Sequence, residues 1–207
     1  MGRGARGVIA RRWAASVLLL GLAAGATTII RQDVPDLSRQ ADAVIRGTVS
    51  RAESRWSGDR RTIFTEVEIQ VAETLKGPAR KTVIVREPGG VVGNIGQRVD
   101  GVASFQKGEE VVVFLARRPD DSFAVEGMAQ GKFRVERSSD GRAAFAVRGD
   151  VDALVLDPAT GRPVQVEQRS RTLDELRGEI RSALAAPPQP TAPMPVPRPL
   201  SPTGEGR

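Results

Sequence analysis

The chain contains no cysteine and no histidine among its 207 residues. Without histidine there is no Ser-His-Asp or Cys-His catalytic pair, and without either residue type there is no zinc site of the usual kind. The absence of cysteine also excludes disulfide bonds, on which small exported domains often depend. Because a chain of this length can bury one adequate core without them, we expect a single domain with tails and no cofactor.

Aromatic residues are also scarce, with two Trp, six Phe and no Tyr. Proteins that bind single-stranded nucleic acid usually stack the bases on aromatic side chains. The net charge of +6 includes four arginines of the first 26 residues, a segment without acidic residues, so the rest of the chain has 27 basic against 25 acidic residues. Acidic residues are interleaved with the basic residues Arg51, Arg55, Arg60, Arg61, Arg86, Arg98 and Lys132. This pattern is typical of a mixed, solvated face, and we expect no nucleic-acid partner.

Acid/base chemistry in this chain would depend on Asp, Glu, Lys or an activated Ser alone. Glu87, Glu109 and Glu110 are the carboxylates that lie near the predicted core or the glycine-rich loop. A glycosidase needs two carboxyl groups at a defined separation, which the sequence cannot establish. A carboxylate-dependent hydrolase of envelope polysaccharide is therefore an alternative, and a non-catalytic protein is the main prediction.

Residues 1–26 have the three parts of a secretory signal peptide. A basic start is followed by an apolar stretch, and Ala24-Gly25-Ala26 provides a cleavage site before Thr27. The alternative is a retained anchor, because the uncharged run from Trp13 to Ile30 is just long enough to span a membrane. We expect cleavage and export to the periplasm or the extracellular space, with membrane contact only if this segment is retained.

The most apolar run beyond the first thirty residues is Phe105 to Ala116. Its centre, Val111 to Leu115, is short, rich in β-branched residues and uninterrupted by polar residues, as in a strand that is buried on both faces. We therefore expect it to be the central strand of a closed or nearly closed β structure.

Alternating apolar residues predict the other strands. Ala43 to Trp56 and Thr62 to Leu75 should form a long antiparallel hairpin, with a bulge at Gly47. Further strands are expected at Lys81 to Arg86, Gln97 to Ala103 (a short edge strand), Phe123 to Val125, Lys132 to Glu136 and Ala143 to Val147, with a final hairpin of Val151 to Leu156 and Val164 to Val166.

Two helices are expected, at Asp33 to Ala41 and at Leu173 to Ala185. The second begins with a capping box of Thr172 and Glu175, and Leu173, Leu176, Ile180 and Leu184 recur on one face that should dock on the barrel. The eight prolines after Ala186 predict a disordered tail over residues 186–207. Residues 27–185 are thus predicted to form one β-barrel domain with a C-terminal helix.

Five segments together resemble a group of uncharacterised exported bacterial proteins. They are Ala41 to Val49, Val67 to Gly77, the glycine-rich loop, Glu109 to Leu115 and Gly127 to Phe133. More distantly, the strand order and the strand-ending Leu75-Lys76-Gly77 resemble the netrin-like module of tissue inhibitors of metalloproteinases. This resemblance implies an OB-like antiparallel barrel. The N-terminal cysteine with which those inhibitors engage a metal has no counterpart here.

The glycine-rich loop between Gly89 and Gly101 is the main candidate for a binding site, because its glycines would let the backbone approach a partner. No helix follows it, so the pattern does not indicate a phosphate cradle. The predicted function is an exported, non-catalytic module that binds a protein or cell-envelope partner; a structural envelope component is a further alternative. The candidate binding residues are Gly89, Gly90, Gly93, Asn94, Gly96, Arg98, Gln130 and Lys132.

Overall fold

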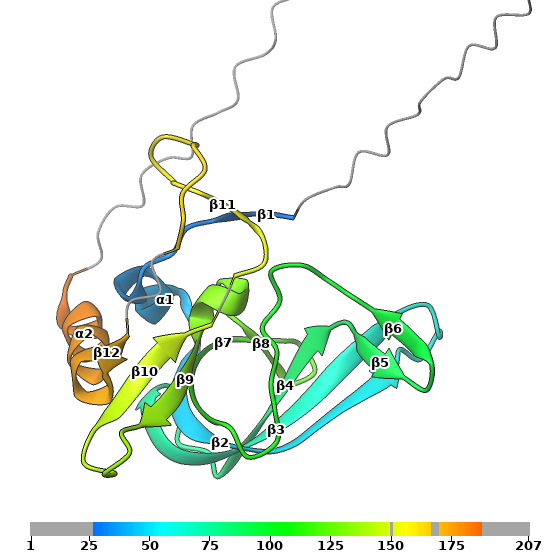
Figure 1. The fold of residues 1–207 in the computed structure, drawn as a ribbon, viewed down its shortest axis with the longest axis horizontal. Helices are drawn as coiled ribbons and strands as arrows, with labels where there is room; N and C mark the ends of the chain where they lie inside the picture. Colours follow the sequence, from blue (N-terminus) through cyan, green and yellow to red (C-terminus); the bar gives the residue numbers. More distant parts are fainter. Residues whose placement is uncertain (1–26, 150, 167–169, 188–207) are drawn as a thin grey trace, which may run out of the picture.

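The computed structural model describes residues 27–149, 151–166 and 170–187 (Figure 1). The predicted signal peptide and most of the predicted disordered tail lie outside these residues. Within the described part of the chain, no helix is long and apolar enough to cross a membrane.

Five strands close into a barrel, as the sequence predicts. Their bounds are β2 (Ala43–Trp56), β3 (Ile63–Lys76), β4 (Thr82–Pro88), β7 (Glu110–Arg117) and β8 (Phe123–Val125). They follow one another around the barrel in the order β7-β2-β3-β4-β8, and pairing of β8 with β7 closes it. The β4–β8 pair is parallel and the others are antiparallel. The strand order is consistent with an OB-like barrel.

The long hairpin of β2 and β3 has the predicted bulge. The register shifts between Arg46 and Gly47, and a Cβ at Gly47 would lie 2.3 Å from the carbonyl oxygen of Gln70. Only glycine can approach the neighbouring strand so closely, which is the usual reason for a glycine inside a strand.

Strand β7 lies between two hydrophobic cores. Val111, Val113 and Leu115 point into the barrel, whereas Val112 and Phe114 point outward into a second core. All five side chains are fully buried. Because successive side chains of a strand point to opposite faces, a strand covered on both sides reads as an unbroken apolar run, and the prediction for this segment is confirmed.

The second core is covered by strands and helices outside the barrel. The strands β9 (Lys132–Arg137), β10 (Ala144–Arg148) and β12 (Arg171–Thr172) extend the sheet from β7, in that order. The helices α1 (Val34–Gln40) and α2 (Leu173–Ala185) pack beside each other on this core (Figure 1).

The helix α2 begins as predicted. The Thr172 hydroxyl accepts a hydrogen bond from the Glu175 backbone nitrogen, and the Glu175 carboxylate accepts one from the Thr172 backbone nitrogen. Leu173, Leu176 and Ile180 are buried. Leu184 was predicted on the same face but is exposed, and Ala183 is buried in its place. The face therefore turns slightly around the helix at its last turn.

The remaining elements differ most from the sequence-based prediction. β1 (Thr28–Ile30) was not predicted and pairs in parallel with β11 (Leu154–Leu156). Val164 to Val166 forms no strand, so the predicted final hairpin is reduced to a bridge between Leu156 and Pro163. Backbone hydrogen bonds from Asp157 to Arg162 and from Val164 to Val155 flank this bridge. The Gln97 to Ala103 edge strand is also wrong, because β5 (Gly90–Val92) and β6 (Ile95–Gln97) form a hairpin inside the glycine-rich loop instead. The 3₁₀ helix η1 (Met128–Gly131) precedes β9.

Candidate functional site

The glycine-rich loop folds into the β5–β6 hairpin, which lies beside the far ends of β2 and β3 (Figure 1). Gly93 and Asn94 form its turn, where Gly93 has φ = +62°, a value that favours glycine. The loop is thus a defined element that packs against the ends of β2 and β3.

A set of hydroxyl hydrogen bonds anchors the hairpin to the barrel strands. The Val91 backbone nitrogen donates to Ser54 Oγ (3.1 Å), and Thr65 Oγ1 donates to the Gly89 carbonyl oxygen (2.8 Å). The two hydroxyl oxygens are 3.0 Å apart and hydrogen-bonded to each other. On the second strand, directly across from Gly90, the Gln97 side-chain carbonyl accepts a hydrogen bond from the Ile63 backbone nitrogen (2.7 Å).

Gly90 is the point of closest approach. Its φ is +132°, and a Cβ there would lie 2.2 Å from Ser54 Oγ and 2.5 Å from Thr65 Oγ1. No side chain fits at this position without displacing the anchoring hydroxyls. The glycine that looks like a flexible loop residue in the sequence therefore permits a fixed contact.

The hairpin presents two apolar side chains to solvent. Val91 is 65% exposed and Ile95 is 51% exposed. In the register of the hairpin Val91 is opposite Gly96 and Ile95 is opposite Val92, so the two side chains lie on opposite faces. The hairpin therefore exposes apolar surface on both of its sides.

A groove of about 370 Å³ lies between the hairpin and the segment Val99 to Phe105. Glu87 lines it and is only 6% exposed, because it follows Val83 and Val85 on the inward face of β4. One carboxylate oxygen accepts a hydrogen bond from the Val125 backbone nitrogen (2.7 Å). Burial raises the pKa of Glu87 to about 7, against the smaller opposite effects of that hydrogen bond and of the Arg118 charge.

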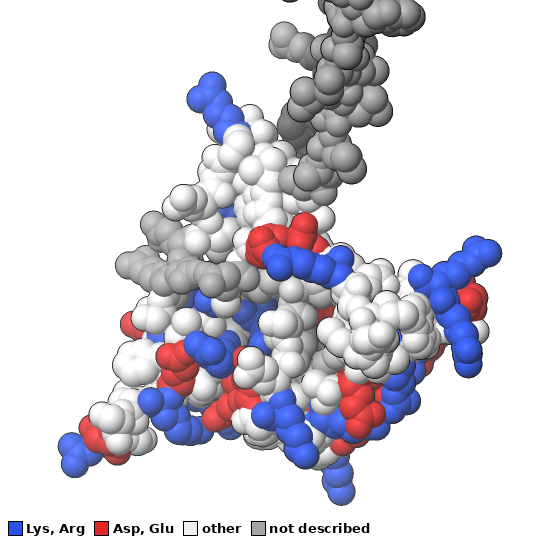
Figure 2. Space-filling view, turned by 45° about the vertical axis from the view of Figure 1, so that its right-hand side comes forward, with Lys and Arg blue, Asp and Glu red and all other residues white. Residues whose placement is uncertain are grey.

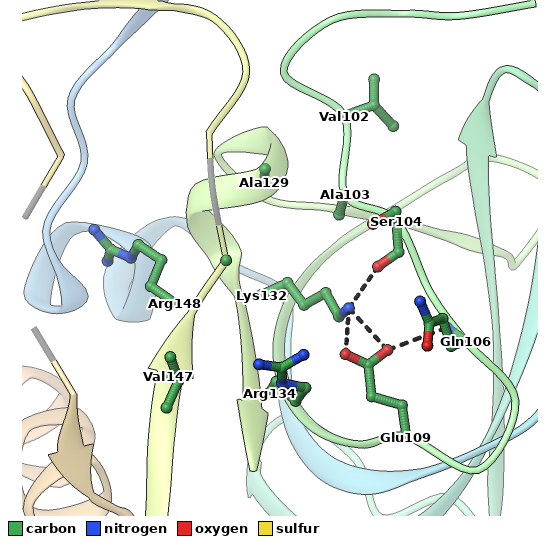
Figure 3. Close-up of a pocket in the computed structure, with 11 residues that line it drawn as sticks. Val102, Ala103, Ser104, Gln106, Glu109, Ala129, Lys132, Arg134, Val147 and Arg148 are labelled. Atoms are coloured by element: carbon green, nitrogen blue, oxygen red, sulfur yellow. Dashed lines mark hydrogen bonds and ion pairs between the residues drawn. The ribbon is translucent and has the colours of Figure 1, made fainter. Parts of the chain in front are cut away.

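A second cavity, of about 360 Å³, lies on the other side of residues 102–104. Figure 3 shows Lys132 and Glu109 meeting within it. The Lys132 ammonium is 2.7 and 2.9 Å from the two Glu109 oxygens, and it lies 4.7 Å from the centre of the Phe105 ring. Burial lowers the pKa of Lys132, and the ion pair only partly offsets this effect. With its charge paired, Lys132 is positioned to hold residues 104–109 against β9.

The sequence-predicted candidates thus lie in different places. Gly89, Gly90, Gly93, Asn94 and Gly96 build the hairpin, whereas Arg98 extends beyond it and pairs with Asp100 and Asp152. Gln130 is buried, and its amide bonds the Gln32 backbone nitrogen and the Ile30 carbonyl oxygen. Gln130 therefore links β1 to η1, and its side-chain amide is used within the fold and not for contact with a partner.

The three predicted carboxylates do not share a cavity. Glu87 lines the groove and Glu109 lines the second cavity. Glu110 pairs with Arg46 (2.6 Å) and Arg137 (2.8 Å) on the outside of the barrel. Burial alone raises the pKa of Glu110, but the hydrogen bonds from these arginines outweigh it and lower the pKa. Among the described residues, no group of three or more Asp, Glu, His or Cys side chains could hold a metal ion.

The arginines on the barrel surface are paired with acids, as expected. Arg51, Arg55 and Arg86 surround Glu66 at 3.8, 3.7 and 3.0 Å. In Figure 2 basic and acidic side chains alternate over the face that is shown, and no broad single-sign patch is visible. On the face shown, the acids therefore balance the basic charge locally.

The sequence reasoning missed the residues that hold the hairpin in place. Ser54 and Thr65 lie opposite each other on β2 and β3, and this pairing can be recognised only once the strand register is known. It also missed Arg148, which lines the second cavity and is buried.

A search for related proteins found no matching family model and no matching curated protein. The functional argument therefore depends on the geometry of the hairpin and the cavities.

Proposed function

We propose that the protein is an exported, non-catalytic binding module that inserts the β5–β6 hairpin into a cleft of a protein partner in the cell envelope. The observation that carries this proposal is the exposure of Val91 and Ile95 on opposite faces of an anchored hairpin. A flat partner surface would cover only one of the two side chains, whereas a cleft covers both.

The anchoring of the hairpin supports this role. Binding costs conformational entropy wherever a loop must become ordered, and a loop that is already fixed avoids much of that cost. Gly90, Ser54 and Thr65 fix the base of the hairpin before any partner arrives. The groove beside the hairpin gives the partner a second place to contact.

The experiment is affinity capture from envelope extracts of the native host, with the partner then purified and titrated against the protein by calorimetry. Val91→Thr/Ile95→Thr removes apolar surface and keeps β-branched residues in the strands. We expect this double variant to lose at least about tenfold in affinity, since truncating a residue at the centre of an interface can cost about 2 kcal/mol or more.

Ile30→Thr is the matched control, because Ile30 is 46% exposed on β1, outside the hairpin. It should bind as tightly as the wild type. If the double variant captures the same proteins with the same affinity as the wild type, the hairpin is not the contact surface and the proposal fails.

The same proposal includes two further points. The protein is exported, and it is related to exported bacterial proteins and, more distantly, to the netrin-like module. The apolar segment with its small-residue cleavage site supports export, and the order of the five barrel strands is compatible with the kinship. N-terminal sequencing of the protein from its host tests the export step: an intact Met1 would contradict cleavage.

The alternative of a carboxylate-dependent hydrolase keeps one favourable observation. Glu87 lies in an open groove with a pKa of about 7, which suits a general acid or base near neutral pH. The groove lacks a second carboxylate among its lining residues, however. An assay of glycan substrates with wild type and Glu87→Gln decides the matter: activity that disappears in the variant would favour the hydrolase.

A further inference from the structure

Arg148 is a buried arginine that forms no ion pair with any of the described residues. It is 7% exposed and ends β10, on the face that carries the buried Ala146. Its guanidinium carbon lies 4.9 Å from the centre of the Phe133 ring. Figure 3 shows the side chain extending away from Lys132, toward the side of the molecule where α1 lies.

No polar group of the described residues satisfies this guanidinium. Its Nε is buried with no hydrogen-bond partner, and no hydrogen bond or ion pair to Arg148 forms among residues 27–149, 151–166 and 170–187. Removing a charge from water without pairing it is strongly unfavourable, so buried arginines are almost always paired. An unpaired one needs an explanation, and an external anion provides it.

A cavity of about 610 Å³ lies on this side of Arg148, a size typical of small-molecule sites. Two other arginines line it, but each has its own acid: Arg31 is 3.3 Å from Asp33, and Arg171 pairs with Glu179. Within each pair the acid neutralises the arginine, so the positive charge of Arg148 is in excess. The Nε of Arg171 is also buried and has no hydrogen-bond partner within the described part of the chain, which adds a second donor at the same cavity.

The aromatic contact does not replace an anion. Arg171 lies 5.9 Å from the centre of the same Phe133 ring, so two cations share one ring and repel each other. Burial, followed by the Arg171 charge, lowers the pKa of Arg148 to about 10, although Asp33 and Glu179 act in the opposite direction. At neutral pH Arg148 is still charged, and an oxyanion between the two arginines would relieve this repulsion.

We infer that Arg148, with Arg171 beside it, recognises the oxyanion group of a small ligand, a phosphate or a carboxylate, that enters the cavity between α1, β10 and α2. A guanidinium presents parallel N–H donors that match either group. The inference is independent of the hairpin and of the partner proposed for it.

The test is calorimetric titration of the full chain with sodium phosphate and, separately, with sodium acetate, at constant ionic strength set with sodium chloride. We expect saturable binding of at least one anion, and the anion that saturates identifies the group. Arg148→Met, which keeps the packing on Phe133 and removes the donors, should weaken binding by about 10- to 100-fold.

Arg142→Met is the matched control, because the Arg142 side chain is 89% exposed at the turn between β9 and β10. It should bind as the wild type does. Arg148→Lys keeps the charge without the fork and should bind with intermediate affinity, so it provides a second variant if Arg148→Met does not fold. Absence of saturable binding by the wild type overturns the inference, as does equal affinity of the wild type and Arg148→Met. Wild-type protein would show no saturable binding if a carboxylate of the chain itself were already paired with Arg148.

Discussion

Glu87 illustrates how position in a strand decides the chemistry of a residue. It follows Val83 and Val85 at two-residue spacing, so its carboxyl group points into the barrel. In the sequence it is one acidic residue among 25, and its burial follows only from the strand register. The alternation of apolar residues indicates which side chains of β4 point inward. In the sequence, however, Arg86 and Pro88 on either side of Glu87 leave it ambiguous whether the strand extends as far as Glu87.

The raised pKa of Glu87 predicts a pH-dependent stability. Folded Glu87 holds its proton up to about pH 7, whereas in the unfolded chain it loses the proton near 4.5. Since the folded state binds more protons between these values, the free energy of unfolding should fall as pH rises from 5 to 8, by on the order of 3 kcal/mol. Urea unfolding at intervals of one pH unit measures this decrease.

Glu87→Gln is the control for that experiment, because it stays neutral and can still accept the Val125 hydrogen bond. Its stability should vary less between pH 5 and pH 8 than that of the wild type, and it should be the more stable of the two at pH 8. Parallel pH profiles for both proteins would contradict the assignment.

Gly90→Ala tests the anchor of the hairpin. The strained φ alone should cost about 1–3 kcal/mol, and the overlap with Ser54 Oγ adds to that cost. Gly58→Ala is the comparison, because a Cβ at Gly58 meets no atom within 4 Å and its φ is not in the left-handed region. Chemical denaturation of both variants should show a loss of stability only for Gly90→Ala. If the two variants were equally stable, the hairpin would be able to move and accommodate the new Cβ at position 90 without a loss of stability.

At the scale of the elements, long periodic segments were predictable, whereas only some of the short ones were. The hairpin of β2 and β3, the strand β7 and the helix α2 each carry a signal of hydrophobic spacing over several residues. The strands β1, β5 and β6 have three residues each, too few for a period to show. The equally short β8 and β11 fall within the predicted segments Phe123 to Val125 and Val151 to Leu156. β1 and β11 are more than 120 residues apart, so their pairing depends on the completed fold and not on local sequence.

The candidate site was predictable in part for the same reason. The glycine density of residues 89–96 indicated this loop as the candidate site, but the anchoring of its hairpin depends on Ser54 and Thr65 in other strands. Gln130 and Lys132 were chosen as polar residues near a glycine-bounded turn, and their burial against β1 and Glu109 could not be read from the sequence. Tertiary partners decide whether a polar residue is free to bind.

The capping box of α2 gives a prediction at this scale. Thr172→Ala removes the hydroxyl that accepts from the Glu175 backbone nitrogen, and should lower the free energy of unfolding by about 1 kcal/mol. Thr172→Ser keeps the hydroxyl and should be close to the wild type. Thermal unfolding followed by circular dichroism measures both. If the serine variant lost as much stability as the alanine variant, the cap would not be the cause.

At the scale of the molecule, β7 couples the barrel to the layer formed by α1, α2, β9 and β10. We therefore predict a single cooperative transition. Trp56, the only tryptophan after residue 26, reports on the end of β2, while the circular dichroism signal at helical wavelengths reports on α2. The two signals should change at the same denaturant concentration.

Phe114→Ala sharpens this test. Phe114 is fully buried in the outer core, with its ring centroid 6.0 Å from that of Phe133, and its truncation should cost about 3–5 kcal/mol. Both signals should move together to lower denaturant concentration. Loss of the helical signal before the Trp56 signal would show instead that the two cores unfold separately.

The two-sided burial of β7 also limits which alignments of this strand the chain can accept. A slip of one residue would exchange its two sets of side chains, placing Phe114 among the small β-branched residues of the barrel and Val113 against Phe133. Strands with one solvated face lose only burial in such a slip. Here both interiors would be misfilled at once, so the sequence Val111 to Leu115 selects a single register for every strand paired with it.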